Sequence, residues 1–156
     1  MEFPFRSSFA AVRPEWIDFN GHLNMAYYSV LFDTSVDELY PHIGFGEDYV
    51  KATGCTTYVA EFHICYLREL HEGDEVSATF YLVDHDLKRF HFYQELWHRD
   101  GWCAATGEGI TLHVDQSGPR VAPMPAATQS ALRHYASSQG PLPEGNRIGR
   151  QISLSK

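Results

Sequence analysis

The spacing of large apolar residues along the chain changes near residue 24. From there to about residue 43 they recur every three or four positions, which is typical of a helix with one face in a core. Two adjacent rows form this face: Tyr27, Leu31, Ser35 and Leu39, and Tyr28, Phe32, Val36 and Tyr40. Asn24 is a favourable N-cap residue, and Gly44 with Gly46 interrupts the pattern. We therefore predict one long helix that begins after Asn24 and ends before Gly44.

Strand patterns lie on both sides of this helix. Residues 8–18 predict a first strand that Pro14 interrupts, and residues 19–23 predict a turn built on Asn20-Gly21. After the helix, apolar and polar positions alternate in segments joined by short turns, which indicates an antiparallel meander. The predicted strands of this meander are residues 56–70, 75–86, 88–100 and 102–115.

The first strand of the meander has two different faces. One face carries Tyr58, Ala60, Phe62, Ile64 and Tyr66, and the other carries Val59, Glu61, His63, Cys65 and Leu67. In the last strand, Gly107 and Gly109 share one face, where a sheet bends or another group approaches its backbone closely. Residues 126–138 predict a short helix, and we expect the tail that follows it to be extended.

A first strand, a long helix and then four strands in a row predict an α+β fold with the helix against one face of the sheet. There is no repeat and no change of composition, so residues 1–156 should form a single domain. Its core should cover about residues 8–115, with a C-terminal helix and tail over 116–156. One helix is too narrow to cover a five-stranded sheet, so we expect self-association as a homodimer or homotetramer.

Composition and charge narrow the range of functions. With 44% hydrophobic residues, including 14% aromatic ones, the chain can form an ordinary packed core. Its net charge of −8 repels a phosphate backbone, so we expect no nucleic-acid partner. No stretch is apolar enough to predict a membrane span, and residues 1–16 do not resemble a signal peptide. The three cysteines, Cys55, Cys65 and Cys103, predict reduced thiols in a cytoplasmic protein better than a disulfide framework.

One segment of the sequence resembles a known family. Residues 16–33, WIDFNGHLNMAYYSVLFD, are similar to the D-x-x-G-H-x-N-x-x-Y signature of hot-dog thioesterases related to 4-hydroxybenzoyl-CoA thioesterase. This resemblance covers about residues 8–115 and implies a hot-dog fold, in which a five-stranded antiparallel sheet wraps a long central helix. A narrower resemblance, to the betainyl-CoA thioesterases of carnitine catabolism, extends nearly to the C-terminus. It rests on PEWIDFNGHLNMAYY, TTYVAEFHICYLREL, HDLKRFHFYQEL and LHVDQSGPRVAPMP. In that branch an acidic residue can stand at the position of Asn24.

The resemblance implies that Asp18 is the nucleophile or general base of thioester hydrolysis. Such a reaction also needs donors that stabilise the developing oxyanion. The backbone N–H groups of Gly21, His22 and Leu23, next to the positive end of the helix, are candidate donors. His22 could also orient Asp18 or bind the substrate, while Asn24 suits a helix cap better than a catalyst. The structural alternative is that Asp18 only caps the turn, that Gly21 is only a turn glycine and that His22 is a surface group.

The candidates for binding the acyl group are aromatic and ionisable side chains, because aromatic faces and a carboxylate recognise a trimethylammonium group such as that of betaine. These residues are Trp16, Tyr27, Tyr28, Glu61, His63 and Tyr66, with Tyr58 as a further aromatic group. Glu61 and His63 share a strand face and could reach an active site across a dimer interface. The alternatives are a solvated strand face and, for most of the aromatic residues, a place in the core.

Coenzyme A carries phosphates, so an acidic protein must present local positive charge to bind it. Arg68, Lys88 and Arg89 lie at predicted strand ends and are the candidates, with Arg147 and Arg150 as further ones. Ordinary solvated charge is the alternative for each of them. The nine histidines form no metal-binding pattern, so no metal is predicted. No glycine loop for a nucleotide occurs, so we expect no cofactor beyond the coenzyme A of the substrate.

The predicted function is therefore hydrolysis of a small acyl-CoA thioester, with betainyl-CoA as the more specific hypothesis. Two other functions stay open. A hot-dog hydratase or dehydratase would act on a β-hydroxyacyl thioester through a His–acid pair, for which Asp18 and His22 lack the expected spacing. A non-catalytic acyl-CoA-binding dimer would keep the aromatic pocket and release no thiol.

Overall fold

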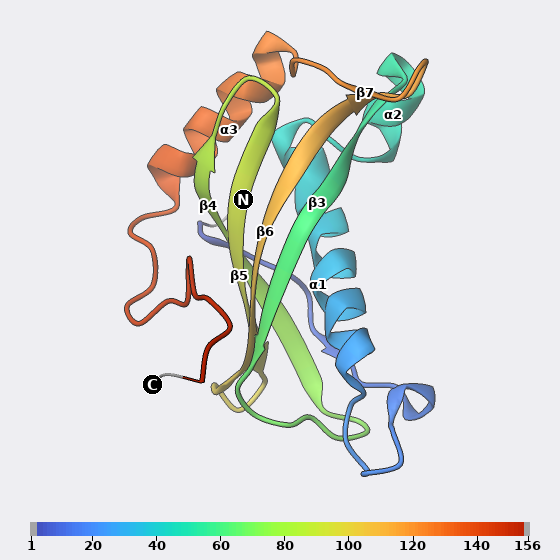
Figure 1. Ribbon diagram of the computed structural model, residues 1–156, viewed down its shortest axis with the longest axis vertical. Helices are drawn as coiled ribbons and strands as arrows, with labels where there is room; N and C mark the ends of the chain where they lie inside the picture. Colours follow the sequence, from blue (N-terminus) through green and yellow to red (C-terminus); the bar gives the residue numbers. More distant parts are fainter. Residues whose placement is uncertain (1–2, 155–156) are drawn as a thin grey trace.

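A curved antiparallel sheet wraps one long helix in the computed structural model, which describes residues 3–154 (Figure 1). The helices are α1 (Met25–Leu39), α2 (Glu47–Thr53) and α3 (Ala126–Ser138), with 3-10 turns η1 (Pro14–Trp16) and η2 (Tyr40–Ile43). The strands are β1 (Phe5–Arg6), β2 (Ala10–Ala11), β3 (Cys55–Tyr66), β4 (Glu75–His85), β5 (Arg89–His98), β6 (Cys103–Asp115) and β7 (Arg120–Val121). The sheet order is β1-β4-β5-β6-β3, with β2 paired to β4 and β7 paired to β6. The strand pairs are antiparallel, so the predicted α+β fold with an antiparallel sheet around a long helix is confirmed. The sheet has seven strands rather than the predicted five, because the short strands β2 and β7 pair with β4 and β6 beside the five strands of the main order.

The long helix has the start that its sequence predicts. The side-chain oxygen of Asn24 accepts the N–H of Ala26 at 3.0 Å, which satisfies one of the amides that lack a partner in the first turn. One face of the helix is buried, through Tyr28, Leu31, Phe32, Ser35, Val36 and Leu39. The turn η2 continues the helix to Gly44, whose φ of 81° is a left-handed conformation that suits glycine.

The meander strands β3 to β6 lie close to their predicted ranges, whereas the N-terminal prediction is wrong. Residues 8–18 contain only the two-residue strand β2, and a 3-10 turn begins at Pro14. Proline has no N–H for a sheet and a fixed φ, so the chain turns there. The strand predicted to continue to residue 70 ends at Tyr66, because the N–H groups of Leu67 and Arg68 both donate to the carbonyl of Ala104.

A β-bulge divides β3 and changes which of its side chains face the helix. Val59 and Glu61 oppose consecutive residues of β6, so Ala60 between them has no partner. Val59 and Phe62 consequently line the same cavity behind α1. The predicted alternation is therefore wrong for the first half of β3, where Tyr58 lies on the face opposite to Phe62.

The two glycines of β6 let other groups approach the sheet closely. A Cβ atom on Gly107 would lie 2.6 Å from Cζ of Phe62. A Cβ atom on Gly109 would lie 2.6 Å from Cζ of Phe92 and 2.9 Å from the carbonyl oxygen of Glu61. These distances are well inside van der Waals contact, so the predicted close approach at these glycines is confirmed.

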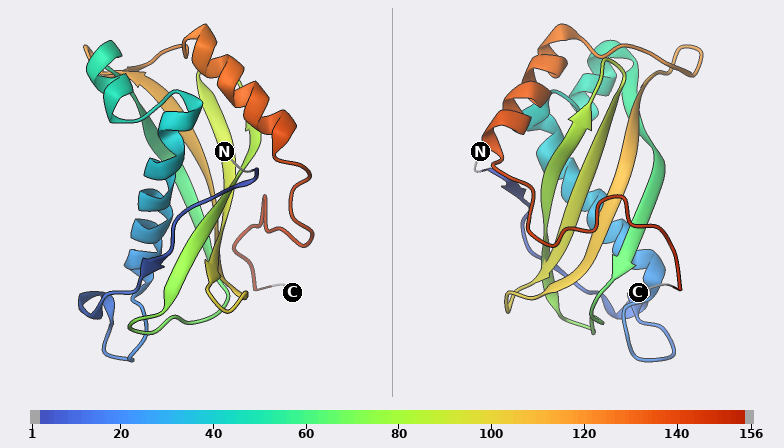
Figure 2. Two further views of the ribbon diagram at one scale, coloured as in Figure 1. Left: turned by 180° about the vertical axis from the view of Figure 1, so that it is seen from behind. Right: turned by 60° about the vertical axis from the view of Figure 1, so that its left-hand side comes forward.

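The C-terminal helix and the tail cover different faces of the sheet (Figure 2). Helix α3, in its predicted range, packs beside β4, where the Tyr135 hydroxyl donates to the carbonyl of Phe80 at 2.7 Å and accepts the N–H of Phe5 at 3.0 Å. The tail after α3 crosses the face opposite α1, where the N–H of Gly149 donates to Glu108 at 2.8 Å. We refer to the α1 side as the inner face and to the tail side as the outer face.

Two sequence expectations concern the environment of the protein. Within residues 3–154, no helix is both long enough and apolar enough to cross a membrane. The three cysteines are free thiols, as predicted. Burial, followed by the nearby charge of Glu95, raises the pKa of Cys103 to about 11, so this thiol is protonated at neutral pH.

Candidate functional site

The chain doubles back just before α1, and this turn places Asp18 beside the start of the helix. The N–H of Asp18 donates to the carbonyl of His22 at 2.9 Å, and Gly21 has a φ of 81° within the turn. The N–H of Asn20 donates to Oδ1 of Asp18 at 2.8 Å, so the carboxylate does cap the turn. The same side chain is half-buried and lines a pocket, so capping and a chemical role are compatible.

A pocket of about 360 Å³ lies at the N-terminal end of α1, and we call it the Asp18 pocket. Its walls are Asp18, His22, Leu23, Met25, Tyr28, Tyr66, Leu67, Arg68 and Glu69. The predicted site residues that it brings together are Asp18, His22, Tyr28, Tyr66 and Arg68. The sequence pattern does not single out Leu67 and Glu69, because it assigns them to a strand, whereas the chain turns toward the helix after Tyr66.

Two of the three backbone N–H groups predicted to stabilise an oxyanion already donate hydrogen bonds within the fold. The N–H of Gly21 donates to the carbonyl of Asp18 at 3.0 Å, and that of Leu23 donates to the carbonyl of Leu70 at 2.7 Å. Asn24 is the helix cap. The first turn of α1 borders the pocket through Met25, so the positive end of the helix is the better candidate for stabilising an oxyanion there.

His22 faces two groups other than Asp18. Its Nε2 lies 3.4 Å from Oε2 of Glu69, and its ring meets the ring of His71 edge-on, with centroids 5.2 Å apart. One potential ligand atom from each of these three residues lies within 4.8 Å of the others, a spacing that a metal ion could bridge. Glu69 and His71 are exposed, and exposed groups of this kind are common without a metal, so the spacing assigns no metal role.

Two of the aromatic residues predicted to bind the acyl group, Trp16 and Tyr27, stack on each other. Trp16 and Tyr27 stack with their centroids 5.4 Å apart, and the Arg13 guanidinium lies 5.0 Å from the indole. Tyr28 and Tyr66 line the Asp18 pocket and meet edge-on at 5.1 Å. Tyr28 is only 4% exposed, whereas Tyr66 is 47% exposed, so Tyr66 offers the larger aromatic surface to a ligand.

A second pocket, of about 540 Å³, adjoins the first. Leu67, Arg68 and Glu69 line both pockets, so the two are neighbours on either side of this segment. The guanidinium of Arg68 lies 4.0 Å from the centre of the Trp102 ring, and His98 stacks on the same indole at 4.4 Å. This cation–π contact holds the positive charge of Arg68 at the junction of the two pockets.

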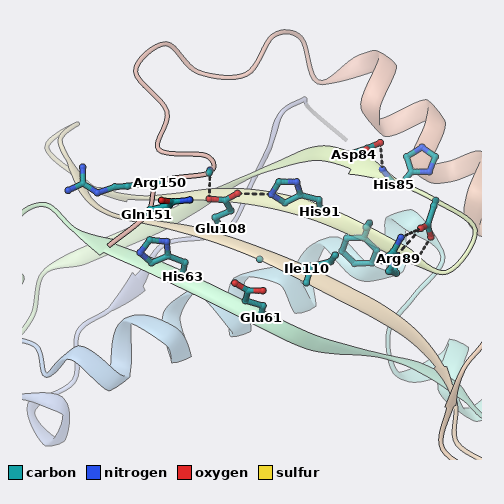
Figure 3. Close-up of a pocket in the computed structure, with 14 residues that line it drawn as sticks. Glu61, His63, Asp84, His85, Arg89, His91, Glu108, Ile110, Arg150 and Gln151 are labelled. Carbon is teal, nitrogen blue, oxygen red and sulfur yellow. Dashed lines mark hydrogen bonds and ion pairs between the residues drawn. The ribbon is translucent and has the colours of Figure 1, made fainter. Parts of the chain in front are cut away.

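Glu61 and His63 lie on the outer face of the sheet (Figure 3). They line a pocket of about 520 Å³ together with side chains of β5, β6 and the tail, including Arg150. In this pocket Nε2 of His91 lies 2.8 Å from Oε1 of Glu108. Within one chain, therefore, Glu61 and His63 do not reach the Asp18 pocket on the inner side.

Lys88 and Arg89 are also far from the Asp18 pocket. They belong to the β4–β5 hairpin, at the end of the sheet opposite the start of α1 (Figure 1). Arg89 pairs with Asp86 at 2.6 Å, and hydrogen bonds from the Lys88 N–H and from Arg89 lower the pKa of Asp86. Their polar groups stabilise the hairpin, and Arg68 is the predicted coenzyme A ligand that lies at the Asp18 pocket.

The architecture and this pocket define a class of protein. A long helix wrapped by an antiparallel sheet, with a half-buried aspartate beside the start of the helix, is the arrangement of a hot-dog thioesterase. Residues 12–132 match the thioesterase-like superfamily, and the chain belongs to this family. The enzyme is accordingly a thioester hydrolase.

The relatives and the solved structures agree with this class. The chain is 35% identical to the betainyl-CoA thioesterase of Pseudomonas aeruginosa, over 92% of this chain and 91% of that protein. It is 36% identical to the L-carnitine dehydrogenase/betainyl-CoA thioesterase of Agrobacterium fabrum, over 92% of this chain but 30% of that longer protein. A Staphylococcus aureus protein solved in complex with CoA has a TM-score of 0.89 and 28% identity, over 99% of this chain and 98% of that one. The family resemblance stated from the sequence is confirmed.

Proposed function

We propose that this chain hydrolyses a small acyl-CoA thioester in the Asp18 pocket, with Asp18 as general base or nucleophile. The observation that carries the proposal is the half-buried carboxylate of Asp18, which shares one pocket with the first turn of α1. A carboxylate can activate the attacking water, and the positive end of a helix can stabilise an oxyanion. The similarity to betainyl-CoA thioesterase makes betainyl-CoA the first substrate to test. The three free thiols support a cytoplasmic location.

The reaction needs one proton acceptor and one stabilised oxyanion. In the general-base form, Asp18 takes a proton from water while the water oxygen attacks the thioester carbon. The carbonyl oxygen becomes negative beside the first turn of α1, the C–S bond breaks, and the departing thiolate takes up the proton. In the nucleophilic form, the Asp18 carboxylate attacks the thioester carbon, and the C–S bond breaks to give an anhydride and the CoA thiolate. Water then hydrolyses the anhydride to the free acid, which regenerates the Asp18 carboxylate and supplies the proton that the thiolate takes up.

The most direct test replaces Asp18 with asparagine, which is nearly isosteric. Asp18→Asn should reduce kcat for thiol release about 10²–10⁴-fold, the usual contribution of such a group, while the circular dichroism spectrum stays unchanged. Asp48→Asn, an exposed carboxylate on α2, is the matched control and should retain activity. Near-normal hydrolysis by Asp18→Asn would remove this residue from the chemistry. Binding of CoA thioesters without any thiol release by the wild type would instead favour the non-catalytic dimer.

Coenzyme A is proposed to extend from the Asp18 pocket past Arg68 into the adjoining pocket. The Arg68 guanidinium is already ordered against Trp102, so less entropy is lost when it binds a phosphate. Arg68→Ala should therefore raise KM more than it lowers kcat. An unchanged KM for acyl-CoA would place the phosphates elsewhere.

The acyl group is proposed to meet Tyr66 and Glu69 at the rim of the Asp18 pocket. One aromatic face contributes about 0.5–2 kcal/mol to binding a quaternary ammonium, which is about a two- to thirtyfold preference for the cation. Betainyl-CoA and 3,3-dimethylbutyryl-CoA have the same shape, because carbon replaces nitrogen in the second compound. Equal kcat/KM values for the two would refute the cation site and leave thioester hydrolysis in place.

The edge strand β3 supports the proposed homodimer. It has twelve residues and lies at one end of the sheet order, so the backbone N–H and C=O groups along its free edge can pair with another strand. Large apolar side chains are exposed along it and next to it: Met25, Tyr58, Val59, Tyr66 and Leu67. A second copy of the chain on this edge would cover them. Light scattering should give about 35 kDa or more, twice the chain mass of 17.8 kDa, and a fully active monomer would contradict this assembly.

A further inference from the structure

Three side chains with metal-binding atoms meet at the edge of the Asp18 pocket, and we call them the His22 cluster: His22, Glu69 and His71. His22 belongs to the turn before α1, whereas Glu69 and His71 belong to the segment between β3 and β4 (Figure 1). The N–H of Leu23 donates to the carbonyl of Leu70 at 2.7 Å, so a backbone hydrogen bond joins the two segments. The fold therefore holds the three side chains next to one another.

The distance between His22 and Glu69 matches a shared zinc ion better than a direct contact. Nε2 of His22 lies 3.4 Å from Oε2 of Glu69. A direct N–H···O hydrogen bond is shorter, about 2.7–3.2 Å. Zinc binds nitrogen and oxygen at about 2.0–2.2 Å, so two ligands of one tetrahedral ion lie about 3.3–3.6 Å apart. The observed distance falls within the second range.

His71 completes a ligand set that zinc uses in proteins. Its potential ligand atom lies within 4.8 Å of those of His22 and Glu69. The His71 side chain is 55% exposed, so a rotation of the ring can close the remaining gap. Two imidazoles and one carboxylate are a known set for tetrahedral zinc and leave a fourth position open. Magnesium prefers oxygen ligands, so this set favours zinc over magnesium.

The surroundings of the His22 cluster also favour a cation. Nδ1 of His71 lies 3.9 Å from Oδ2 of Asp74, and a histidine that binds a metal commonly has a carboxylate next to its other ring nitrogen. The adjoining pocket carries three carboxylates, those of Glu69, Asp74 and Asp100, against the one permanent positive charge of Arg68. This excess of negative charge attracts a divalent ion.

We propose that the His22 cluster binds a divalent cation of the zinc type at the rim of the Asp18 pocket. The spacing of the three atoms alone assigns no metal, but the His22–Glu69 distance, the carboxylate beside His71 and the local negative charge all favour one. His22 and Glu69 line the Asp18 pocket, and Glu69 and His71 line the adjoining one. The bound ion would therefore lie where the two pockets meet.

Such an ion would change the charge that the rim presents to the acyl group. Glu69 is the carboxylate proposed above to meet a cationic acyl group. With zinc bound, this carboxylate is a metal ligand, and the rim gains two positive charges that repel a trimethylammonium group. Zinc should therefore inhibit hydrolysis of a cationic acyl-CoA more than that of a neutral one. This step rests on the proposed function, whereas the metal site itself does not.

Calorimetry with zinc chloride tests the site without any turnover. The wild type should bind one Zn²⁺ per chain at the His22 cluster, and His71→Ala should weaken this binding at least about tenfold, because it removes one of three ligands. His42→Ala, which changes an exposed histidine on η2, is the matched control and should bind zinc like the wild type. Magnesium chloride should give no binding heat at the same concentration. Equal zinc affinities for His71→Ala and the wild type would overturn the proposal.

Cobalt distinguishes the His22 cluster from the three free thiols of the chain. Co²⁺ held by imidazole and carboxylate absorbs in the visible range, whereas Co²⁺ held by a thiolate also gives an intense charge-transfer band in the near ultraviolet. The wild type should show the visible absorption alone, and His71→Ala should lose it. A thiolate band that persists in His71→Ala would place the metal on the cysteines and overturn the proposal.

Thiol release then connects the ion to the substrate. We compare kcat/KM for betainyl-CoA and 3,3-dimethylbutyryl-CoA with and without zinc, since the ratio of the two cancels any effect of the ion on the shared coenzyme A. Zinc should lower the ratio of betainyl to dimethylbutyryl activity about five- to tenfold, the effect of a divalent charge roughly 8 Å from the ammonium in water. In His71→Ala the same zinc concentration should leave the ratio unchanged.

The outcomes separate this inference from the proposed function. A wild-type ratio that saturating zinc leaves unchanged would overturn the effect of the ion on the substrate. Zinc binding that depends on His71 in a protein that hydrolyses neither thioester would support the metal site and refute the proposed function. An active thioesterase whose calorimetry shows no zinc binding would refute the metal site and leave the proposed function in place.

Discussion

Gly109 offers a quantitative check on how tightly β6 is packed. In Gly109→Ala, the new Cβ would lie 2.6 Å from Cζ of Phe92 and 2.9 Å from the carbonyl oxygen of Glu61. Phe92 is 4% exposed, and the carbonyl belongs to the neighbouring strand, so neither can move away freely. Overpacking of this kind costs about 1–3 kcal/mol, and the lower entropy of the unfolded alanine chain offsets about 0.4–1 kcal/mol. The expected net loss of stability is about 1–2 kcal/mol.

Thermal unfolding measures this loss. For a chain of this length, about 1 kcal/mol shifts the melting temperature by about 2–4 °C, so Gly109→Ala should melt about 2–8 °C below the wild type. All samples need one protein concentration, because the proposed self-association would make the melting temperature concentration-dependent. Gly118→Ala is the matched control, since a Cβ there would meet nothing within 4 Å, and it should melt like the wild type.

Gly107→Ala provides the internal comparison. Its new Cβ would lie just as close to Phe62, yet the contacting atoms are the end of a half-buried ring that lines the cavity between α1 and the sheet. This ring can shift into that cavity, so Gly107→Ala should lose less stability than Gly109→Ala. Equal melting temperatures for Gly109→Ala and Gly118→Ala would refute the packing argument.

Two further predictions concern buried polar groups. Tyr135→Phe removes a hydroxyl that accepts the N–H of Phe5 and donates to the carbonyl of Phe80. It should lower the free energy of unfolding by about 1–3 kcal/mol, as measured by denaturant titration. An unchanged midpoint of unfolding would contradict this prediction. Burial raises the pKa of Glu95 above its ordinary 4.5, and a hydrogen bond from Trp97 opposes this shift. The folded state therefore holds the Glu95 proton to a higher pH than the unfolded state does, and it loses stability as the pH rises through the raised pKa. Glu95→Gln should therefore melt above the wild type at neutral pH, with a difference that shrinks as the pH falls to 4.5, and a lower melting point at neutral pH would refute it.

The helix and the meander could be predicted because their sequence signals are local. Asn24 caps α1 as its position before an apolar stripe predicts, and β4, β5 and β6 follow the alternation between turns. The prediction of a strand over residues 8–18 was wrong because Pro14 breaks the pairing that its apolar neighbours favour. Helix α2 was not predicted, since its seven residues are too few for a periodic pattern to stand out.

The candidate site could be predicted only where its residues are close in sequence. Asp18 and His22 come together through a turn that Asn20-Gly21 signals, and Tyr28 follows within the first turns of α1. Arg68 reaches the same pocket through a change of direction after β3 that no local pattern marks. Glu61 lies across the sheet from this pocket, and its predicted role depends on a partner chain, which a single sequence does not specify.

The bulge in β3 shows why strict alternation fails there. With strict alternation, Tyr58 would share the inner face with Phe62. The extra residue Ala60 moves Tyr58 to the outer face and places Val59, a smaller side chain, in the cavity between α1 and the sheet. The shift shows only in the pairing of β3 with β6, two strands far apart in the sequence, so the alternation within β3 alone cannot encode it. A single unpaired residue in the edge strand therefore decides which side chains of its first half face α1.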